Sequence, residues 1–361
     1  MSTMQNRFFR RLAALTALAL SLGAVACDGD PNEPEIAERL VLTVNSVENS
    51  LSLVPVDGGG EVQARAVGLG AQGTPTGVSA RGAYAVVPLG IYPFAAVVNL
   101  RSGQVQSRVA LPANSGATGS EFLNDSIAVV ANPGRNSVTP VNVRRGTAGA
   151  EVAVGTYPAA VISDGARVYV LNGNLVNFAP AGPGSVTVLD EQLRTVRTVQ
   201  LTGINPSAGA IVGNRLYVLN AGSFGGSNGS LSVVNLQTLA EESHHTGFGE
   251  FPSSIAASPG GDLYVGIYGT GIVVWDPRSR TFRVPLNAPI KPAGSGIVSG
   301  IGFGYAGRLH TVNAGSCQTP GAMYRLSAGD GSLERTVQVG ICPFGIAFAD
   351  VPEEEDEDLS E

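Results

Sequence analysis

The sequence predicts an all-β fold built from one repeated four-stranded unit, and three observations support this. The 361 residues include 48 glycines and 22 prolines but only 14% charged residues, against roughly 25% in an ordinary soluble domain. Apolar residues alternate with a period of two in many short runs, and no long helical stripe interrupts them. Finally, one arrangement of these runs recurs about every 45 residues, a period typical of arrays and propellers.

The repeat contains two conspicuous strands. The first ends in Asn in most copies and occupies residues 40–45, 127–132, 167–172, 215–220, 262–268 and 308–313. The second ends in Asp or Asn and occupies residues 52–57, 95–99, 185–190, 230–235 and 271–276. A short apolar segment and a tight turn precede the first strand, and Gly-x-x-Pro joins successive units at 155–158, 203–206, 249–252 and 340–343. Four strands per repeat, joined as a meander, form one blade of a β-propeller.

Counting repeats predicts seven blades. Six are complete, at residues 74–116, 117–157, 158–205, 206–251, 252–293 and 294–342. Residues 343–349 and 36–73 are each too short for a blade, so we expect them to combine, with the C-terminal segment as the innermost strand. Pairing of the N- and C-terminal strands would close the ring and remove exposed sheet edges. Six or eight blades fit the repeats less well.

The recurrent polar residues at strand ends have structural and functional interpretations. A ring of ligand-binding amides could be formed by Asn45, Asn132, Asn172, Asn220 and Asn313, but a residue repeated in most blades is more simply a turn former. Asx turns before the outermost strand are expected at Asp57, Asn99, Asn142, Asp190, Asn235 and Asp276.

The repeat resembles a known family. Tyr217-Val-Leu-Asn220, Ser232-Val-Val-Asn235 and the later Gly249-x-x-Pro252 are similar to the YVTN, or YncE-like, β-propeller repeat, and the likeness extends over residues 36–351. The resemblance implies the fold and leaves function open, because one fold hosts many chemistries. Its lactonase, lyase and quinoprotein relatives imply an alternative function, a propeller enzyme that acts over the central channel.

The chain ends predict export and anchoring. Residues 1–26 have a basic segment followed by an apolar one too short to span a bilayer, which is typical of a removed signal peptide. Ala24-Val-Ala-Cys27 resembles a bacterial lipobox, so Cys27 is the predicted lipidation site, with an ordinary signal peptide and a free Cys27 as the alternative. Residues 27–38 would be an acidic tether, 39–351 the single propeller domain, and 352–361 an acidic disordered tail.

Cys317 and Cys342 are the remaining cysteines, and an exported chain meets an oxidising compartment. The loop between the second and third strands of a meander opens on the same face as the exit of the fourth strand. Cys317 lies in such a loop and Cys342 follows the fourth strand, so a disulfide is predicted, with two unpaired thiols as the alternative.

Loops on that face carry aromatic residues. Residues 173–184 and 221–229 form longer loops than their equivalents, and a recognition rim is predicted from Tyr92, Phe94, Phe178, Phe224 and Tyr268. Variable solvent-exposed loops are the alternative interpretation.

Few residues are candidates for catalysis or metal binding. His310 replaces a strand tyrosine, and His244-His245 falls in an outer strand. The plausible ionisable residues on the channel face are Glu250, Lys291 and Arg135, which form no recognisable set. We therefore predict no catalytic residue, metal ligand or cofactor.

The formal charge of −7 does not describe the ring, because residues 39–352 hold 19 basic and 17 acidic residues. We expect a monomeric lipoprotein of the cell envelope, on its periplasmic or cell-surface face. It would contact the membrane through Cys27 and bind a protein or surface polymer, but no nucleic acid, as a non-catalytic scaffold.

Overall fold

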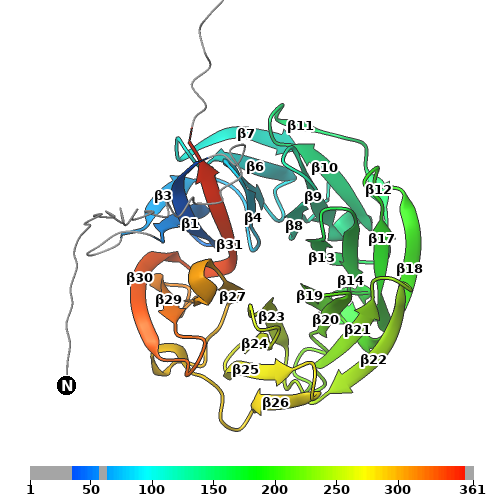
Figure 1. The fold of residues 1–361 in the computed structure, drawn as a ribbon. Coiled ribbons are helices and arrows are strands. Elements are labelled where there is room, and N and C mark those ends of the chain that lie inside the picture. Colours follow the sequence, from blue (N-terminus) through cyan, green and yellow to red (C-terminus); the bar gives the residue numbers. More distant parts are fainter. Residues whose placement is uncertain (1–34, 57–62, 354–361) are drawn as a thin grey trace, which may run out of the picture. The chain divides into compact units, whose positions relative to one another are not determined.

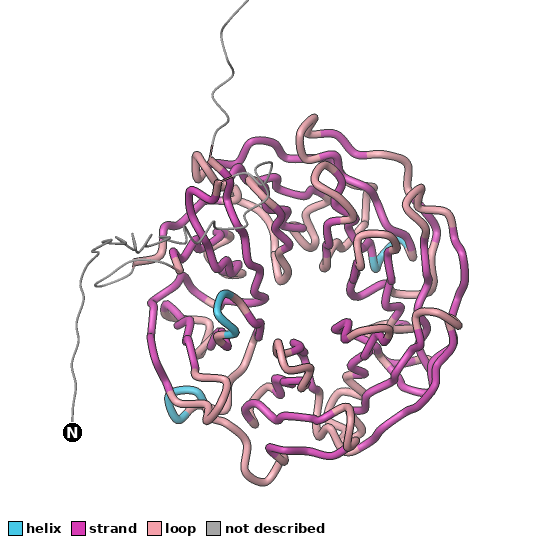
Figure 2. The backbone as a smooth tube through the Cα atoms, viewed as in Figure 1, coloured by secondary structure: helices cyan, strands magenta, loops and turns pink. Residues whose placement is uncertain are grey.

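Seven four-stranded antiparallel blades form a closed ring in the computed structural model, which describes residues 35–56 and 63–353 (Figure 1). The innermost strand of each blade faces the centre, and the chain runs outward from there. Within the described residues helix is limited to three short 3-10 segments, η1 (Pro133–Arg135), η2 (Pro292–Gly294) and η3 (Tyr305–Gly307) (Figure 2). The predicted all-β, seven-bladed propeller is therefore confirmed.

The blades are numbered 1–7 along the chain, each listed from its innermost strand outward. Blade 1 contains β4 (Ser79–Arg81), β5 (Tyr84–Pro88), β6 (Phe94–Asn99) and β7 (Gln104–Ala110). Blade 2 contains β8 (Ser120–Phe122), β9 (Ile127–Asn132), β10 (Ser137–Asn142) and an outer strand in two pieces, β11 (Thr147–Ala148) and β12 (Val152–Ala153). Blade 3 contains β13 (Pro158–Ser163), β14 (Val168–Asn172), β17 (Pro183–Leu189) and β18 (Thr195–Ile204). A separate hairpin, β15 (Leu175–Val176) and β16 (Ala179–Pro180), folds the long loop of blade 3.

The remaining blades follow the same order. Blade 4 contains β19 (Pro206–Val212), β20 (Arg215–Asn220), β21 (Ser230–Asn235) and β22 (Ala240–Thr246). Blade 5 contains β23 (Pro252–Ala257), β24 (Leu263–Ile267), β25 (Gly271–Asp276) and β26 (Thr281–Val284). Blade 6 contains β27 (Gly300–Phe303), β28 (Leu309–Asn313), β29 (Pro320–Leu326) and β30 (Leu333–Ile341). Blade 7 contains β31 (Pro343–Pro352), β1 (Ile36–Asn45), β2 (Ser50–Pro55) and β3 (Arg65–Gly68).

Blade 7 closes the ring as predicted, with β31 innermost and β1 beside it. Their antiparallel register runs from Asn45 opposite Pro343 to Ile36 opposite Pro352. This pairing moves the predicted domain boundaries, because Ile36–Glu38 and Pro352 belong to strands rather than to a tether and a tail. The predicted signal peptide, Cys27 and most of both tails lie outside the described residues. No helix in the described part of the chain is long and apolar enough to cross a bilayer.

The hydrophobic core is divided into seven clusters, one at each seam between adjacent blades. Strand β14 contributes side chains to two of these seams. Val168 and Val170 pack into the seam with blade 2, whereas Tyr169 and Leu171 pack into the seam with blade 4. Both faces of the inner strands are therefore buried, which explains why they read as nearly continuous apolar runs.

The strand-end asparagines are structural, but their role differs from the predicted turn formation. The side chains of Asn45, Asn132, Asn172 and Asn220 are at most 1% exposed. Each donates through Nδ2 to hydroxyl groups of the third strand, as from Asn172 to Ser185 Oγ at 3.1 Å and Thr187 Oγ1 at 3.0 Å. Only Asn313 follows the turn interpretation, because its Oδ1 accepts a hydrogen bond from Gly315 N.

In three of the four Gly-x-x-Pro linkers the glycine packs against one of these asparagines, whereas Gly249 packs against Leu286. A Cβ at Gly155 would lie 2.6 Å from Cγ of Asn172, and one at Gly340 would lie 2.6 Å from Cγ of Asn45. A Cβ at Gly203 would overlap the amide of Asn220. These three linkers therefore require glycine because each crosses directly over a buried amide.

Substitution of Gly203 by Ala is expected to lower the free energy of unfolding by about 2–3 kcal/mol, because Asn220 is fully buried and cannot move away without losing its hydrogen bond to Ser232. Urea denaturation would measure this loss. Gly68→Ala is the matched control, because a Cβ there meets no atom within 4 Å. Equal stability of the two variants would refute this account of the linker.

The second set of polar residues forms the expected Asx turns. Oδ1 accepts backbone hydrogen bonds from residues two to four positions further on at Asn99, Asn142, Asp190, Asn235 and Asp276. Asp57 lies outside the described residues. These side chains hold the turn before each outer strand rather than a ligand.

Candidate binding site at the channel mouth

Two kinds of connection meet at one end of the ring, which we call the loop face. It contains the loops between the second and third strands of the blades, at residues 46–49, 89–93, 133–136, 173–182, 221–229, 268–270 and 314–319. The linkers that enter each innermost strand open on the same end because the strands alternate in direction. The hairpin turns between first and second strands, and between third and fourth, lie at the opposite end.

An open cavity of about 790 Å³ lies on the loop face, where blades 4 to 7 and the linker into blade 1 approach the central channel. Its walls combine aromatic rings, hydroxyl groups and backbone, with one carboxylate, Glu250. The lining side chains include Phe224, Phe251, Tyr268, Phe344, Ile301, Ser253, Ser254, Ser299, Thr76 and Thr270. A cavity of this size, largely apolar with a few polar groups, is typical of a ligand site.

The aromatic wall is built by a loop and the linker that follows it. Phe224, in the loop between β20 and β21, is 89% exposed, and its ring meets that of Phe251 edge to face at 6.0 Å. Phe251 precedes Pro252 and has a φ of +46°. Such a left-handed backbone is uncommon for an aromatic residue.

The same linker position has positive φ in three other blades, at Tyr157, Asn205 and Cys342. Sequence reasoning missed this position, although it is the third residue of the recognised Gly-x-x-Pro motif in each of these linkers. In all three of these linkers the carbonyl accepts a hydrogen bond from the residue after the strand-end asparagine: from Gly173 N to Tyr157 O at 2.8 Å, from Ala221 N to Asn205 O at 2.8 Å and from Ser46 N to Cys342 O at 3.0 Å. The linkers are therefore fixed to the next blade by backbone contacts.

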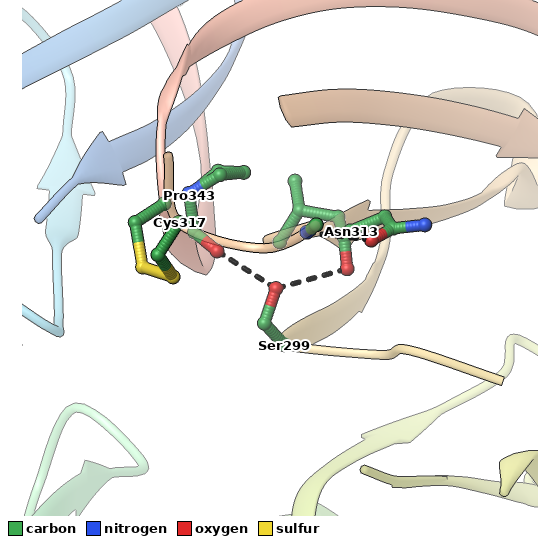
Figure 3. Close-up of a disulfide and its surroundings, with 7 residues drawn as sticks. Ser299, Asn313, Cys317 and Pro343 are labelled. Carbon is green, nitrogen blue, oxygen red and sulfur yellow. Dashed lines mark hydrogen bonds between the residues drawn. A yellow bond between two sulfur atoms is a disulfide. The ribbon is translucent and has the colours of Figure 1, made fainter. Parts of the chain in front are cut away.

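The predicted pairing of Cys317 and Cys342 is present as a disulfide, with a Cα–Cα distance of 4.4 Å. It connects a loop to the following linker, as the Phe224–Phe251 contact does in blade 4. Figure 3 shows Ser299 beside it, with Oγ donating to Pro343 O at 2.7 Å and lying 3.1 Å from Val312 O. Ser299 also lines the cavity, so its hydrogen bond connects the cavity wall to Pro343, the residue after Cys342.

The five predicted rim residues do not form one surface. Phe224 and Tyr268 line the cavity. Phe178 is 81% exposed on the hairpin of blade 3, where its ring meets Tyr157 edge to face at 6.3 Å.

The other two rim residues pack inward. Tyr92 and Phe94 stack on each other at 4.7 Å and contact the core cluster between blades 7 and 1. They are half-buried because the short loop of blade 1 folds back over that seam. The five residues therefore do not form the continuous rim that the sequence predicted.

The three ionisable residues predicted on the channel face do not lie together either. Glu250 lines the cavity. Arg135 pairs with Glu151, with Nε to Oε1 at 3.2 Å, and Lys291 precedes η2; neither lines the cavity. Within residues 35–56 and 63–353 no group of three His, Cys, Asp or Glu side chains could hold a metal ion.

The histidines lie away from the cavity. His310 is 5% exposed in β28, and burial lowers its pKa to about 4. Its ring meets Phe348 at 5.5 Å, as expected for a packing residue. His244 and His245 lie in the outer strand β22, as predicted.

Sequence reasoning missed Glu121, in the innermost strand β8 of blade 2. The equivalent register position in blades 3, 4 and 5 holds Ile162, Ala210 and Ala256. Burial raises the pKa of Glu121 from 4.5 to about 7, against the smaller lowering effects of a hydrogen bond from Phe122 N and of Arg81. The only sequence signal was a carboxylate at an apolar repeat position.

Glu121 should make stability depend on pH. The folded state retains the proton above the ordinary Glu pKa, so the free energy of unfolding falls as pH rises from about 4.5 to 7 and then levels off. We compare the free energy of unfolding of Glu121→Gln with that of wild type at each pH. This difference is expected to favour the variant by about 2–3 kcal/mol more at pH 8 than at pH 4. Urea denaturation at both pH values measures this, with exposed Glu191→Gln as control. A difference that does not change with pH would contradict the assignment.

Comparison with known proteins establishes the class. No protein-family model matches the chain, and no curated protein matches it in sequence. A chain of hydrazine synthase from Kuenenia stuttgartiensis superposes with a TM-score of 0.59 and 15% identity, covering 76% of this chain and 89% of that one. The WD40 β-propeller domain of Doa1 gives 0.55 and 11% identity, covering 77% and 89%. At these identities the likeness shows the fold alone: this chain is a β-propeller protein.

Proposed function

We propose that this protein is a lipid-anchored β-propeller of the cell envelope that binds a partner protein or surface polymer through the channel-mouth cavity. The observation that carries this proposal is the cavity of about 790 Å³ with Phe224, Phe251 and Tyr268 in its walls. Large exposed aromatic residues beside a concave surface are typical of interaction sites. Hydroxyl groups of the walls supply hydrogen bonds that orient the bound partner.

The surrounding backbone favours binding without large rearrangement. Asn228 Oδ1 accepts from Ser223 N at 2.9 Å, which braces the loop that carries Phe224. The Cys317–Cys342 disulfide fixes the linker that leads to Phe344, another lining residue. A wall that is ordered before binding loses less conformational entropy when a partner arrives.

The lining supports a binding role rather than a catalytic one. It offers a single carboxylate, Glu250, among aromatic rings and hydroxyl groups. Hydrolytic or lyase chemistry uses a positioned acid and base, which need two convergent groups. The lining residues are therefore better suited to binding a partner than to transferring protons.

The cell-envelope part of the proposal rests on the sequence. The signal-like residues 1–26, the lipobox-like segment at Cys27 and the YVTN-like repeat are its basis. A disulfide in the propeller suits an oxidising compartment. Metabolic labelling with palmitate tests the anchor: label on the wild type that is lost in Cys27→Ser is expected, and secretion of an unlabelled wild-type protein would overturn it.

The binding role is tested by capture from native membranes with the full lipidated protein. Phe224→Ala with Tyr268→Ala should abolish the recovery of a specific partner, because both side chains line the cavity. Phe178→Ala is the matched control, since Phe178 is equally prominent at 81% exposure but lies elsewhere. A partner retained by the double variant, or lost equally in the control, would overturn the proposal.

A further inference from the structure

A second pocket lies at the opposite end of the ring, in the seam between blades 4 and 5. It has a volume of about 230 Å³ and is lined by Arg215, Tyr217, Ser243, His245, Arg278 and Arg280, among others. Arg215 begins β20, whose other end leads to the loop face, and Arg278 and Arg280 lie in the turn between β25 and β26. The pocket is therefore separate from the channel-mouth cavity.

The pocket has excess positive charge. Among the described lining residues the carboxylate is Glu242, which forms an ion pair with Arg215 and accepts a hydrogen bond from Asn235 Nδ2 at 3.3 Å. Both contacts hold the pKa of Glu242 below its ordinary value, with the Arg215 hydrogen bond as the largest cause. Among the described residues, no ion-pair contact joins the guanidinium group of Arg278 or Arg280 to a carboxylate, although Arg280 interacts with Glu242 through its charge.

Arg280 is the uncommitted group of the two. Arg278 donates to the backbone oxygen of Gly260, whereas no hydrogen bond or ion pair joins the Arg280 side chain to any residue in the described part of the chain. The Arg280 backbone is nevertheless fixed, because its N–H donates to Asp276 O at 2.8 Å and its φ is +57°. A rigid turn thus presents to the pocket a guanidinium group that makes no hydrogen bond within the described residues and interacts with Glu242 only through its charge.

Tyr217 adds a free donor that its sister residues lack. In blade 3 the equivalent Tyr169 donates to Asp164 Oδ2 at 2.7 Å, and in blade 5 Tyr264 donates to Ala328 O at 2.6 Å. Across the described ranges no hydrogen bond uses the Tyr217 hydroxyl. Burial raises the pKa of Tyr217, so its hydroxyl keeps the proton that it can donate.

We propose that this pocket binds an oxyanion, a phosphate or sulfate group, through the guanidinium groups of Arg280 and Arg278 and the hydroxyl of Tyr217. Guanidinium donors match the geometry of such anions, and their hydrogen bonds to a charged acceptor are stronger than neutral ones. Trp275 and Pro277 form an apolar wall. The pocket has room for several waters at about 30 Å³ each, so the anion can carry a small organic group.

Isothermal titration calorimetry of the purified full chain tests this site with three probes: inorganic phosphate, sulfate, and glycerol 3-phosphate as a soluble lipid headgroup. At least one probe should bind with one-to-one stoichiometry, more weakly at higher salt. Arg280→Gln should weaken that binding about tenfold or more, and Tyr217→Phe, which keeps the buried ring, should weaken it several-fold.

Arg197→Gln is the control, because it removes an exposed arginine from β18 in blade 3. Tightest binding of glycerol 3-phosphate would indicate a lipid headgroup or related phosphomonoester, and tightest binding of an inorganic ion would indicate the free anion. Absence of binding by all three probes, or equal weakening in Arg197→Gln, would overturn the proposal. The Phe224→Ala, Tyr268→Ala variant should bind the anion normally, so failure of either proposal is distinguishable from failure of the other.

Discussion

Replacing Cys317 and Cys342 together by serine is expected to lower the free energy of unfolding by about 3–4 kcal/mol. The disulfide closes a segment with a sequence separation of 25, and the loss follows from the chain entropy that the unfolded state regains. The bond lies beside the closing strand β31, so its removal also loosens the last seam. Urea denaturation of the oxidised wild type and the double variant measures the difference.

Reduction provides the control for this prediction. A reducing agent should lower the stability of the wild type to nearly that of the double serine variant and leave the variant unchanged. Phe224→Ala, which removes the corresponding loop-to-linker contact in blade 4, should cost about 1 kcal/mol or less because Phe224 is 89% exposed. If the double serine variant were as stable as the oxidised wild type, the disulfide would not be needed to hold the loop and linker together.

Ending the chain after Cys342 is expected to abolish cooperative folding. This deletion removes β31, the innermost strand of blade 7, and leaves β1 as an unpaired edge. It also removes Ala347, Ala349 and Val351 from the core between blades 7 and 1. The loss should exceed about 5 kcal/mol, the lower end of total domain stability.

Ending the chain after Glu353 is the matched control, because it keeps the whole of β31 and its pairing with β1. Thermal unfolding followed by circular dichroism should show a cooperative transition for this control and none for the shorter chain. A cooperative transition of the shorter chain would mean that six blades suffice, and closure by β31 would lose its importance.

The architecture was predictable because local chemistry repeats. The units combine β-branched strands and turn residues, and four of them are joined by a Gly-x-x-Pro linker, so independent local signals agree on one fold. The need to pair the incomplete end segments predicted closure by β31 and β1. The Cys317–Cys342 pairing followed from the meander topology, which places a loop and a linker on the same face.

Other features were misread because their cause lies in another strand or blade. The asparagines appeared to form turns, but Asn172 and Asn220 are buried under linker glycines and donate to the third strand. Tyr92 and Phe94 appeared exposed in a short loop, yet they stack on each other and pack over a seam.

The sequence by itself determined the blade count, the closing pair of strands, the Asx turns and the face on which the loops open. Only the tertiary structure decided that Phe224, Phe251 and Tyr268 share one cavity, and that Arg280 and Tyr217 meet across the seam between blades 4 and 5. The physical reason is that strand and turn preferences act over neighbouring residues. Contacts between blades depend instead on which side chains fill each seam, and those residues lie far apart in the sequence.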